Sequence, residues 1–298
     1  MTSSPTSKLP IICDWLDVTY APDNCPYPEL NLLLLGAGFL VTRDRGGSRC
    51  YVPPSGRGVL QVTHAKRFAR ISASGAACAA LRALGLWDEY LWILSTSTHR
   101  VTRLDAALDL PADAADFLQV LQARYPSGWV NLGRKAQRVT EFLTTRADGR
   151  KSGTYYVGHK DDARQSVRVY DKSLEALEKR SEVIPTTTRI EATARKDKGA
   201  TLRDAAVPAA IFWAIVSPAI ISAPPGAPEW TPNMEQTWVS VPSTYTPAET
   251  LKRRIENSAE LDALLELADS IGPSGRGYML HLLSQRTASR APIEQDAA

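Results

Sequence analysis

Three short stretches of the chain alternate polar and apolar residues with the period of a β-strand. They cover residues 101–110, 166–172 and 188–195. In each stretch one face carries charged groups or a phenol, and the other carries Val, Leu, Ile or Ala. Carboxylates are poor strand formers. A sheet that presents such groups from three strands is therefore expected to serve a site that handles phosphate and a metal.

The pattern around these stretches predicts a repeated order of elements. Strands are expected at 101–110, 138–145, 153–158, 166–171 and 187–195, with helices at 112–124 and 173–181. This β-α-β-β-β-α-β order is close to a split βαβ unit. The first half, with a strand at 11–20, a helix at 28–40, strands between 45 and 72 and a helix at 75–84, looks like a weaker copy. We therefore predict an α+β fold, with a central antiparallel sheet of split βαβ type and helices on one face.

The domain organisation follows from changes in composition. Residues 1–10 are polar and are expected to be a disordered tail, and residues 11–222 form the main domain. Residues 223–232 (APPGAPEWTP) read as a Pro-rich linker. Residues 233–298 are predicted to form a small helical C-terminal region, because Thr246, Pro247 and Glu249 give a helix start and leucine stripes follow.

Composition limits the class of protein and the cellular compartment that are expected. The 298 residues are 44% hydrophobic and 22% charged, as in ordinary soluble proteins, with a net charge of +3. The four cysteines lack CxxC spacing, which argues against a zinc module and favours a reducing cytoplasm. No apolar run is long enough to span a membrane, and the N-terminus lacks a signal-peptide core. Basic residues gather between positions 124 and 172, which indicates either a solvated surface or a phosphate-binding face.

The carboxylates of the patterned strands are candidate metal ligands. Asp105 and Asp109 lie four residues apart on one strand face, so more than about 10 Å separates them. One of them is expected to act together with Glu191 from another strand, and hard oxygen ligands of this kind suit Mg²⁺ or Mn²⁺. The alternative is a structural network in which Asp105 pairs with Arg103 or Arg189.

Three tyrosines are candidates for nucleic-acid chemistry. Tyr170 lies on the polar strand face between Arg168 and Lys172, where a nearby cation would assist a phenol in attacking phosphate. Tyr155 and Tyr156 are adjacent, so one points into the core and one out, and either is a candidate for stacking on an unpaired base. The alternative for each is a structural strand tyrosine. No P-loop motif is present, so the sequence does not support an internal ATPase motor.

Taken together, these motifs resemble the Rep_trans family of replication initiation factors, which includes initiators of rolling-circle plasmids and filamentous phages. The resemblance rests on RLDAALDL, on GTYYVGHKDDARQSVRVYDKSLEA and on TTRIEATAR, with Asp14-Trp15-Leu16 and the ISASG turn in support, and it covers residues 11–200. It implies an origin-specific DNA endonuclease and strand transferase that forms a covalent 5′-phosphotyrosine. It also implies roles for individual residues: Tyr170 and Lys172 are catalytic, Asp105, Glu191 and Asp109 are metal ligands, and Arg103 and Arg189 orient carboxylates or DNA. The stacking candidates Tyr155 and Tyr156, and Lys160 and Arg168 from the basic run, are expected to bind DNA as well.

The sequence leaves alternatives for the metal ligands, the partners and the function. The wider superfamily of such nickases often uses a His-hydrophobic-His strand, which this chain lacks, so acidic ligands would serve if a metal binds. The implied partner is single-stranded or cruciform origin DNA, of a plasmid or a phage, with a host helicase and a homodimer as further expectations. Two other functions compete with nicking: a non-catalytic single-stranded DNA-binding protein, and a hydrolytic metal-dependent nuclease with a structural Tyr170.

Overall fold

A computed structural model describes residues 9–125, 129–131, 136–158, 164–195, 199–220, 259–270, 272 and 275–288. The chain divides into two compact units, Met1–Ser243 and Thr244–Ala298. Most of the predicted N-terminal tail and all of the predicted linker lie outside the described residues.

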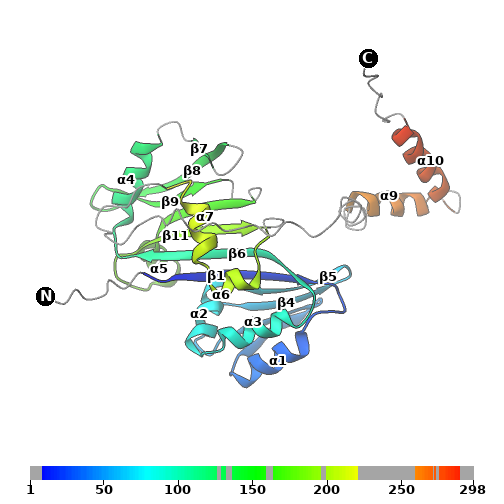
Figure 1. Cartoon of the computed structure of the whole chain (residues 1–298), viewed down its shortest axis with the longest axis horizontal. Helices are drawn as coiled ribbons and strands as arrows, with labels where there is room; N and C mark the ends of the chain where they lie inside the picture. The colour runs from blue at the N-terminus through cyan, green and yellow to red at the C-terminus, as the bar shows by residue number, and fades with distance from the viewer. Residues whose placement is uncertain are drawn as a thin grey trace, which may run out of the picture. The chain divides into compact units, whose positions relative to one another are not determined.

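The described strands of the first unit form one antiparallel sheet, which bears out the predicted α+β class (Figure 1). Its strand order is β2-β3-β4-β5-β1-β6-β11-β10-β9-β8-β7. The strands are β1 (Ile11–Tyr20), β2 (Leu40–Arg45), β3 (Ser48–Val52), β4 (Leu60–Ala65), β5 (Phe68–Ala73), β6 (His99–Leu110), β7 (Trp129–Asn131), β8 (Ala136–Thr145), β9 (Lys151–Val157), β10 (Gln165–Asp171) and β11 (Thr188–Arg195).

The two halves of the sheet meet where β1 pairs with β6. Each half starts with this central strand, continues through a helix and then adds a meander of four strands, β2–β5 or β7–β10. In the first half, β5 returns to pair with β1 directly. In the second half, β11 lies between β6 and β10. The second half therefore matches the predicted order, with one additional short strand, β7.

Seven helices of the first unit are described, and they do not all cover the same face of the sheet. They are α1 (Tyr27–Gly36), α2 (Gly75–Ala83), α3 (Trp87–Ser95), α4 (Ala114–Arg124), α5 (Lys172–Arg180), α6 (Leu202–Ala206) and α7 (Ala209–Val216). Helix α7 contacts β6, β10 and β11, and α4 contacts β9 and β10. Helix α5 lies on the other side of the sheet, behind it in Figure 1. The prediction of helices on a single face is therefore wrong for α5.

The predicted helix at 28–40 ends early. Helix α1 stops at Gly36, and Leu40 already belongs to β2. Gly38 takes a φ of +79°, a conformation that glycine adopts without strain, and the Phe39 amide turns back to donate to the Leu34 carbonyl. The apolar run continues past the helix because Phe39 is part of the core.

Alternation along the central strands separates an apolar face from a polar face. The apolar face joins the core under α4 and α7, and its members include Leu104, Leu108, Val167, Val169 and Ile190. The intervening residues of the same strands point to the opposite face, where Arg103, Asp105, Arg168, Tyr170, Arg189 and Glu191 lie. The three patterned stretches therefore form one polar surface, as predicted.

The second unit is helical, as predicted for the C-terminal region. Helices α9 (Ala259–Ser270) and α10 (Gly275–Ala288) contact each other, and Arg276 donates to both oxygens of Asp269 at 2.5 and 2.7 Å. Within the described ranges, no helix of either unit is both long and apolar enough to cross a membrane.

Candidate active site

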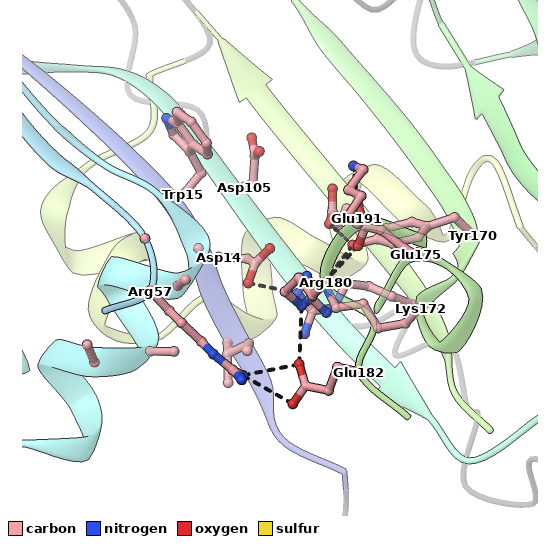
Figure 2. A pocket seen from close by; sticks show the side chains of 18 of the residues that line it. Asp14, Trp15, Arg57, Asp105, Tyr170, Lys172, Glu175, Arg180, Glu182 and Glu191 are labelled. Carbon is pink, nitrogen blue, oxygen red and sulfur yellow. Dashed lines mark hydrogen bonds and ion pairs between the residues drawn. The ribbon is translucent and has the colours of Figure 1, made fainter. Parts of the chain in front are cut away.

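A pocket of about 850 Å³ opens on the polar face of the sheet (Figure 2). One wall comes from β6, β10, β11 and α5, and the opposite wall from β1, the loop before β4 and helix α2. Seven basic and five acidic side chains line it: Arg57, Arg103, Arg168, Lys172, Lys179, Arg180 and Arg189, with Asp14, Asp105, Glu175, Glu182 and Glu191. The excess of positive charge suits a polyanionic ligand such as a DNA backbone.

Tyr170 reaches this pocket from β10 with its hydroxyl fully engaged. The hydroxyl donates to Glu191 Oε1 at 2.8 Å, and Lys172 Nζ lies 3.3 Å from the same oxygen. The guanidinium of Arg168 lies 4.0 Å from the centroid of the ring. Burial, followed by the charge of Glu191, raises the pKa of the phenol, so the resting site holds a neutral tyrosine. The structure thus brings Tyr170, Lys172 and Glu191 together on the polar face of the sheet.

The junction of β10 and α5 fixes the positions of Tyr170 and Lys172. Asp171 caps α5: its Oδ1 accepts from the Leu174 amide and the Ser173 hydroxyl, both at 2.8 Å. Its other oxygen accepts from the buried Ser152 hydroxyl at 2.6 Å. Tyr170 is thus the last strand residue before the cap, and Lys172 is the first helical residue after it.

Helix α5 also holds Lys172 in place through Glu175. Glu175 accepts from Lys172 at 3.0 Å and from Lys179 at 2.9 Å. Burial opposes the charge of Glu175, but the two lysines outweigh it and lower the pKa of its carboxyl to about 2. The lysine beside the Tyr170 oxygen is therefore paired and oriented before any ligand binds.

The predicted metal ligands do not form a metal site in this arrangement. Arg103 donates to both oxygens of Asp105, at 3.0 and 2.5 Å, and Arg168 donates to Glu191 Oε1 at 2.7 Å. Within the described part of the chain, no three His, Cys, Asp or Glu side chains gather closely enough to hold an ion. A divalent ion does not fit unless these carboxylates first leave their arginines. The structural alternative, an ion pair of Asp105 with Arg103, is what the structure contains.

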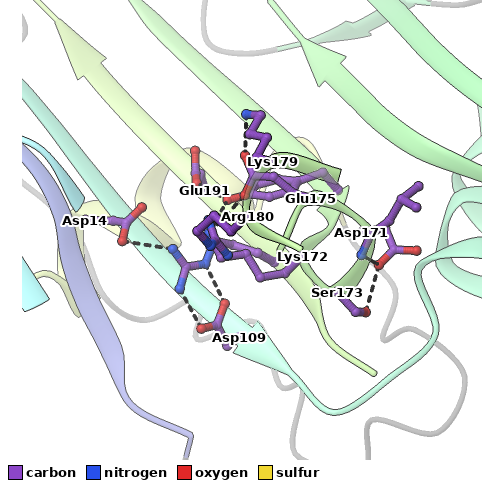
Figure 3. A network of polar contacts seen from close by, with 12 residues as sticks. Asp14, Asp109, Asp171, Lys172, Ser173, Glu175, Lys179, Arg180 and Glu191 are labelled. Atoms are coloured by element: carbon purple, nitrogen blue, oxygen red, sulfur yellow. Dashed lines mark hydrogen bonds and ion pairs between the residues drawn. The ribbon is translucent and has the colours of Figure 1, made fainter. Parts of the chain in front are cut away.

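Asp109 does not itself line the pocket, and its role as a metal ligand stays a prediction. It is held by Arg189, whose Nε and Nη2 both donate to it at 2.6 Å. The same guanidinium donates to Asp14 Oδ1 at 2.8 Å, so Asp14 and Asp109 flank it (Figure 3). Arg189 is buried and orients these carboxylates, and the predicted contact of Arg189 with DNA does not fit this burial.

The remaining predicted DNA-binding residues differ in their exposure and in the face of the sheet on which they lie. Tyr155 pairs with Val169 on the apolar face and is 1% exposed, so it offers no ring surface to a base, and its prediction as a DNA-binding residue is wrong. Tyr156 pairs with Arg168 on the polar face and is partly exposed, with an edge contact to Phe142. Arg103 stacks on Trp15 with 4.3 Å between its guanidinium carbon and the ring centroid. Lys160 lies outside the described residues.

Sequence reasoning missed Asp14 and Glu175 as parts of the site. Asp14 is the extra residue of a β-bulge, because Cys13 and Trp15 pair with the neighbouring residues Ala106 and Asp105 of β6. For Glu175, the sequence offers one indication: it lies about one turn after Lys172 on the same predicted helix. An i, i+3 spacing of opposite charges would have indicated the Lys172 pair, but nothing in the sequence marks the bulge.

Comparisons with known proteins add a structural similarity. No protein-family model matches the sequence, and no curated protein sequence matches it. Among solved structures, the chain is similar to one described as the rolling circle replication initiator protein from Geobacillus stearothermophilus. The two share 20% sequence identity over 67% of this chain and 78% of the other, with a TM-score of 0.48. A similarity of this size carries no argument about the roles of individual residues.

Proposed function

We propose that this protein is a rolling-circle replication initiator that nicks origin DNA and transfers the strand through a covalent 5′-phosphotyrosine on Tyr170. The observation that carries the proposal is the Tyr170 hydroxyl, held between Glu191 and Lys172 in a pocket with excess positive charge. The motif resemblance described above supports the same activity and names the same tyrosine.

The chemistry begins with the phenol proton. As the Tyr170 oxygen attacks the phosphorus, its proton passes along the existing 2.8 Å hydrogen bond to Glu191. Lys172 Nζ, 3.3 Å away, stabilises the developing phenolate charge. The new bond joins the tyrosine oxygen to phosphorus, and the bond from phosphorus to the 3′-oxygen breaks. The leaving 3′-oxygen takes up a proton, the resulting 3′-OH primes synthesis, and the phosphotyrosine retains the energy needed to reseal the strand.

The arginines around the tyrosine are suited to bind the phosphate. Arg168 stacks on the ring of Tyr170 and pairs with Glu191, while 29% of its side chain remains exposed. A guanidinium presents paired donors that match phosphate oxygens. When DNA enters, Arg168 and Arg103 exchange part of their carboxylate contacts for phosphate contacts, which also frees Glu191 to accept the proton.

The requirement for Mg²⁺ or Mn²⁺ stays a prediction, and no step above uses a metal. It is tested by forming the adduct in EDTA and in Mn²⁺, with the result expected from the resemblance being an adduct only in Mn²⁺. Origin DNA as the partner, a host helicase, a homodimer and a cytoplasmic location likewise stay predictions.

The direct test is adduct formation on a single-stranded oligonucleotide that spans the replicon's origin, read as a product that resists denaturation. We expect an adduct with the unsubstituted protein and none with Tyr170→Phe, which keeps DNA binding. Tyr155→Phe is the matched control, because it removes a neighbouring phenol that is buried on the apolar face, and it should form the adduct.

Each competing function predicts a different outcome of this test. Cleavage without an adduct would favour the hydrolytic nuclease. Retarded mobility without cleavage would favour the non-catalytic binding protein. An adduct of normal yield with Tyr170→Phe would overturn the assignment of the nucleophile.

A further inference from the structure

Asp14 is a carboxylate of the pocket to which the chemistry above gives no role. It is the extra residue of the bulge in β1, and bulges re-aim a side chain out of the regular alternation. The pairs on either side, Cys13 with Ala106 and Trp15 with Asp105, remain in place. The bulge thus turns one acidic side chain toward the pocket without disturbing the strand that carries it (Figure 2).

Helix α2 has a glycine, Gly75, where it lies against the Asp14 carboxylate. A Cβ atom on Gly75 would lie 2.9 Å from Asp14 Oδ1 and 2.7 Å from the Asp14 backbone oxygen, closer than real Cβ contacts allow. The glycine at the start of α2 therefore lets the helix approach the bulge while Asp14 keeps its place. The bulge in β1 and the glycine of α2 are separate features of the structure, and both allow the Asp14 side chain to occupy this position.

Among the carboxylates that line the pocket, Asp14 accepts the fewest hydrogen bonds. Asp105 has both oxygens on Arg103, and Glu191 accepts from both Tyr170 and Arg168. Asp14 accepts one hydrogen bond from Arg189, whose paired donors go to Asp109 instead.

Burial raises the pKa of Asp14 to about 6. The charged groups that face it from the neighbouring elements are Arg189 and Glu191 of β11, Asp105 of β6 and Lys172 of α5. The two basic groups oppose the rise, and the two acids add to it. Asp14 therefore takes up a proton near neutral pH more readily than an exposed aspartate does.

We propose that Asp14 is the general acid that protonates the leaving 3′-oxygen during nicking, and the general base that takes this proton back during resealing. This inference rests on the proposed function, since it completes the same reaction. The tyrosine oxygen bonds to phosphorus and its proton goes to Glu191, while the bond from phosphorus to the 3′-oxygen breaks and Asp14 supplies the proton that makes the 3′-OH. In resealing, the 3′-OH returns its proton to Asp14 and attacks phosphorus, and the departing tyrosine recovers its proton from Glu191.

The test replaces the 3′-bridging oxygen of the scissile phosphate with sulfur. A thiol has a pKa of about 8.5, so it leaves as a thiolate and needs no proton donor. The full-length protein and Asp14→Asn are compared on oxygen and sulfur oligonucleotides of the same sequence. We expect Asp14→Asn to lose on the order of 10² to 10⁴-fold in nicking rate on oxygen and to match the unsubstituted protein on sulfur.

A ratio of rates from one preparation does not depend on how much of the variant is folded. Asp109→Asn is the matched control, because Asp109 shares Arg189 with Asp14 but does not line the pocket. Whatever its absolute rate, its sulfur-to-oxygen ratio should equal that of the unsubstituted protein. The role of Asp14 is overturned if Asp14→Asn is impaired equally on both substrates, or on neither. If the unsubstituted protein forms no adduct on either substrate, the proposed function fails instead.

Discussion

Replacing Asp14 by asparagine should stabilise the protein near neutral pH while it removes activity. The folded state raises the pKa of Asp14 from 3.8 to about 6, chiefly through burial. Between these values the folded protein binds more protons than the unfolded chain. The contribution of Asp14 to stability is therefore fully present below about pH 3.8 and is lost as the pH rises to about 6.

The magnitude follows from the size of the shift. A rise of about 2 pKa units, at about 1.4 kcal/mol per unit, makes ionised Asp14 cost about 3 kcal/mol in the folded state at pH 7. The side chain is 17% exposed, so screening by solvent removes only part of this cost. Asparagine keeps an oxygen for Arg189 but carries no charge. The variant should therefore be more stable than the unsubstituted protein at pH 7, by up to about 3 kcal/mol.

Urea unfolding of both proteins at pH 7 and pH 5 measures this effect. Because both proteins share every other titrating group, the difference between them isolates Asp14. The advantage of Asp14→Asn should shrink by about 1 kcal/mol between pH 7 and pH 5. An advantage that is absent at pH 7, or that grows as the pH falls, would refute the reasoning that the fold holds Asp14 at an energetic cost.

Two further predictions test the parts of the structure that position the site. Tyr155→Phe should leave stability unchanged or raise it by about 1 kcal/mol in urea unfolding, because the buried Tyr155 hydroxyl has no hydrogen-bond partner among the described residues; a loss above that size would contradict its placement. Asp171→Ala should cost about 2 to 4 kcal/mol, because it removes the α5 cap and leaves the buried Ser152 hydroxyl unpaired. A loss within about 0.5 kcal/mol in the same assay would speak against the cap.

Local patterning predicted the strands that carry the site. The alternation along residues 101–110, 166–172 and 188–195 corresponds to β6, β10 and β11, and it placed Tyr170 and Glu191 on one face. Tyr170 and Glu191 come into contact only because β11 pairs with β10, in a register that puts Arg168 opposite Glu191. Alternation alone shows the face of each strand but not its neighbours, so the motif order carried that part of the prediction.

The features that the sequence did not reveal depend on long-range pairing. A one-residue bulge changes the face of Asp14, and no local pattern distinguishes a bulged strand from a regular one. The choice between Tyr155 and Tyr156 depended on the register of β9 against β10. The contact between Asp109 and Arg189, eighty residues away in sequence, was not predicted either, because it depends on the pairing of β6 with β11.

The proposed function requires that the Tyr170 oxygen becomes bonded to DNA. The protein is incubated with the origin oligonucleotide, digested with nuclease and protease, and its peptides are analysed by mass spectrometry for a residual nucleotide. We expect a 5′-linked nucleotide on the peptide that contains Tyr170, at that residue. A nucleotide on any other tyrosine, or cleaved DNA with no modified peptide, would contradict it.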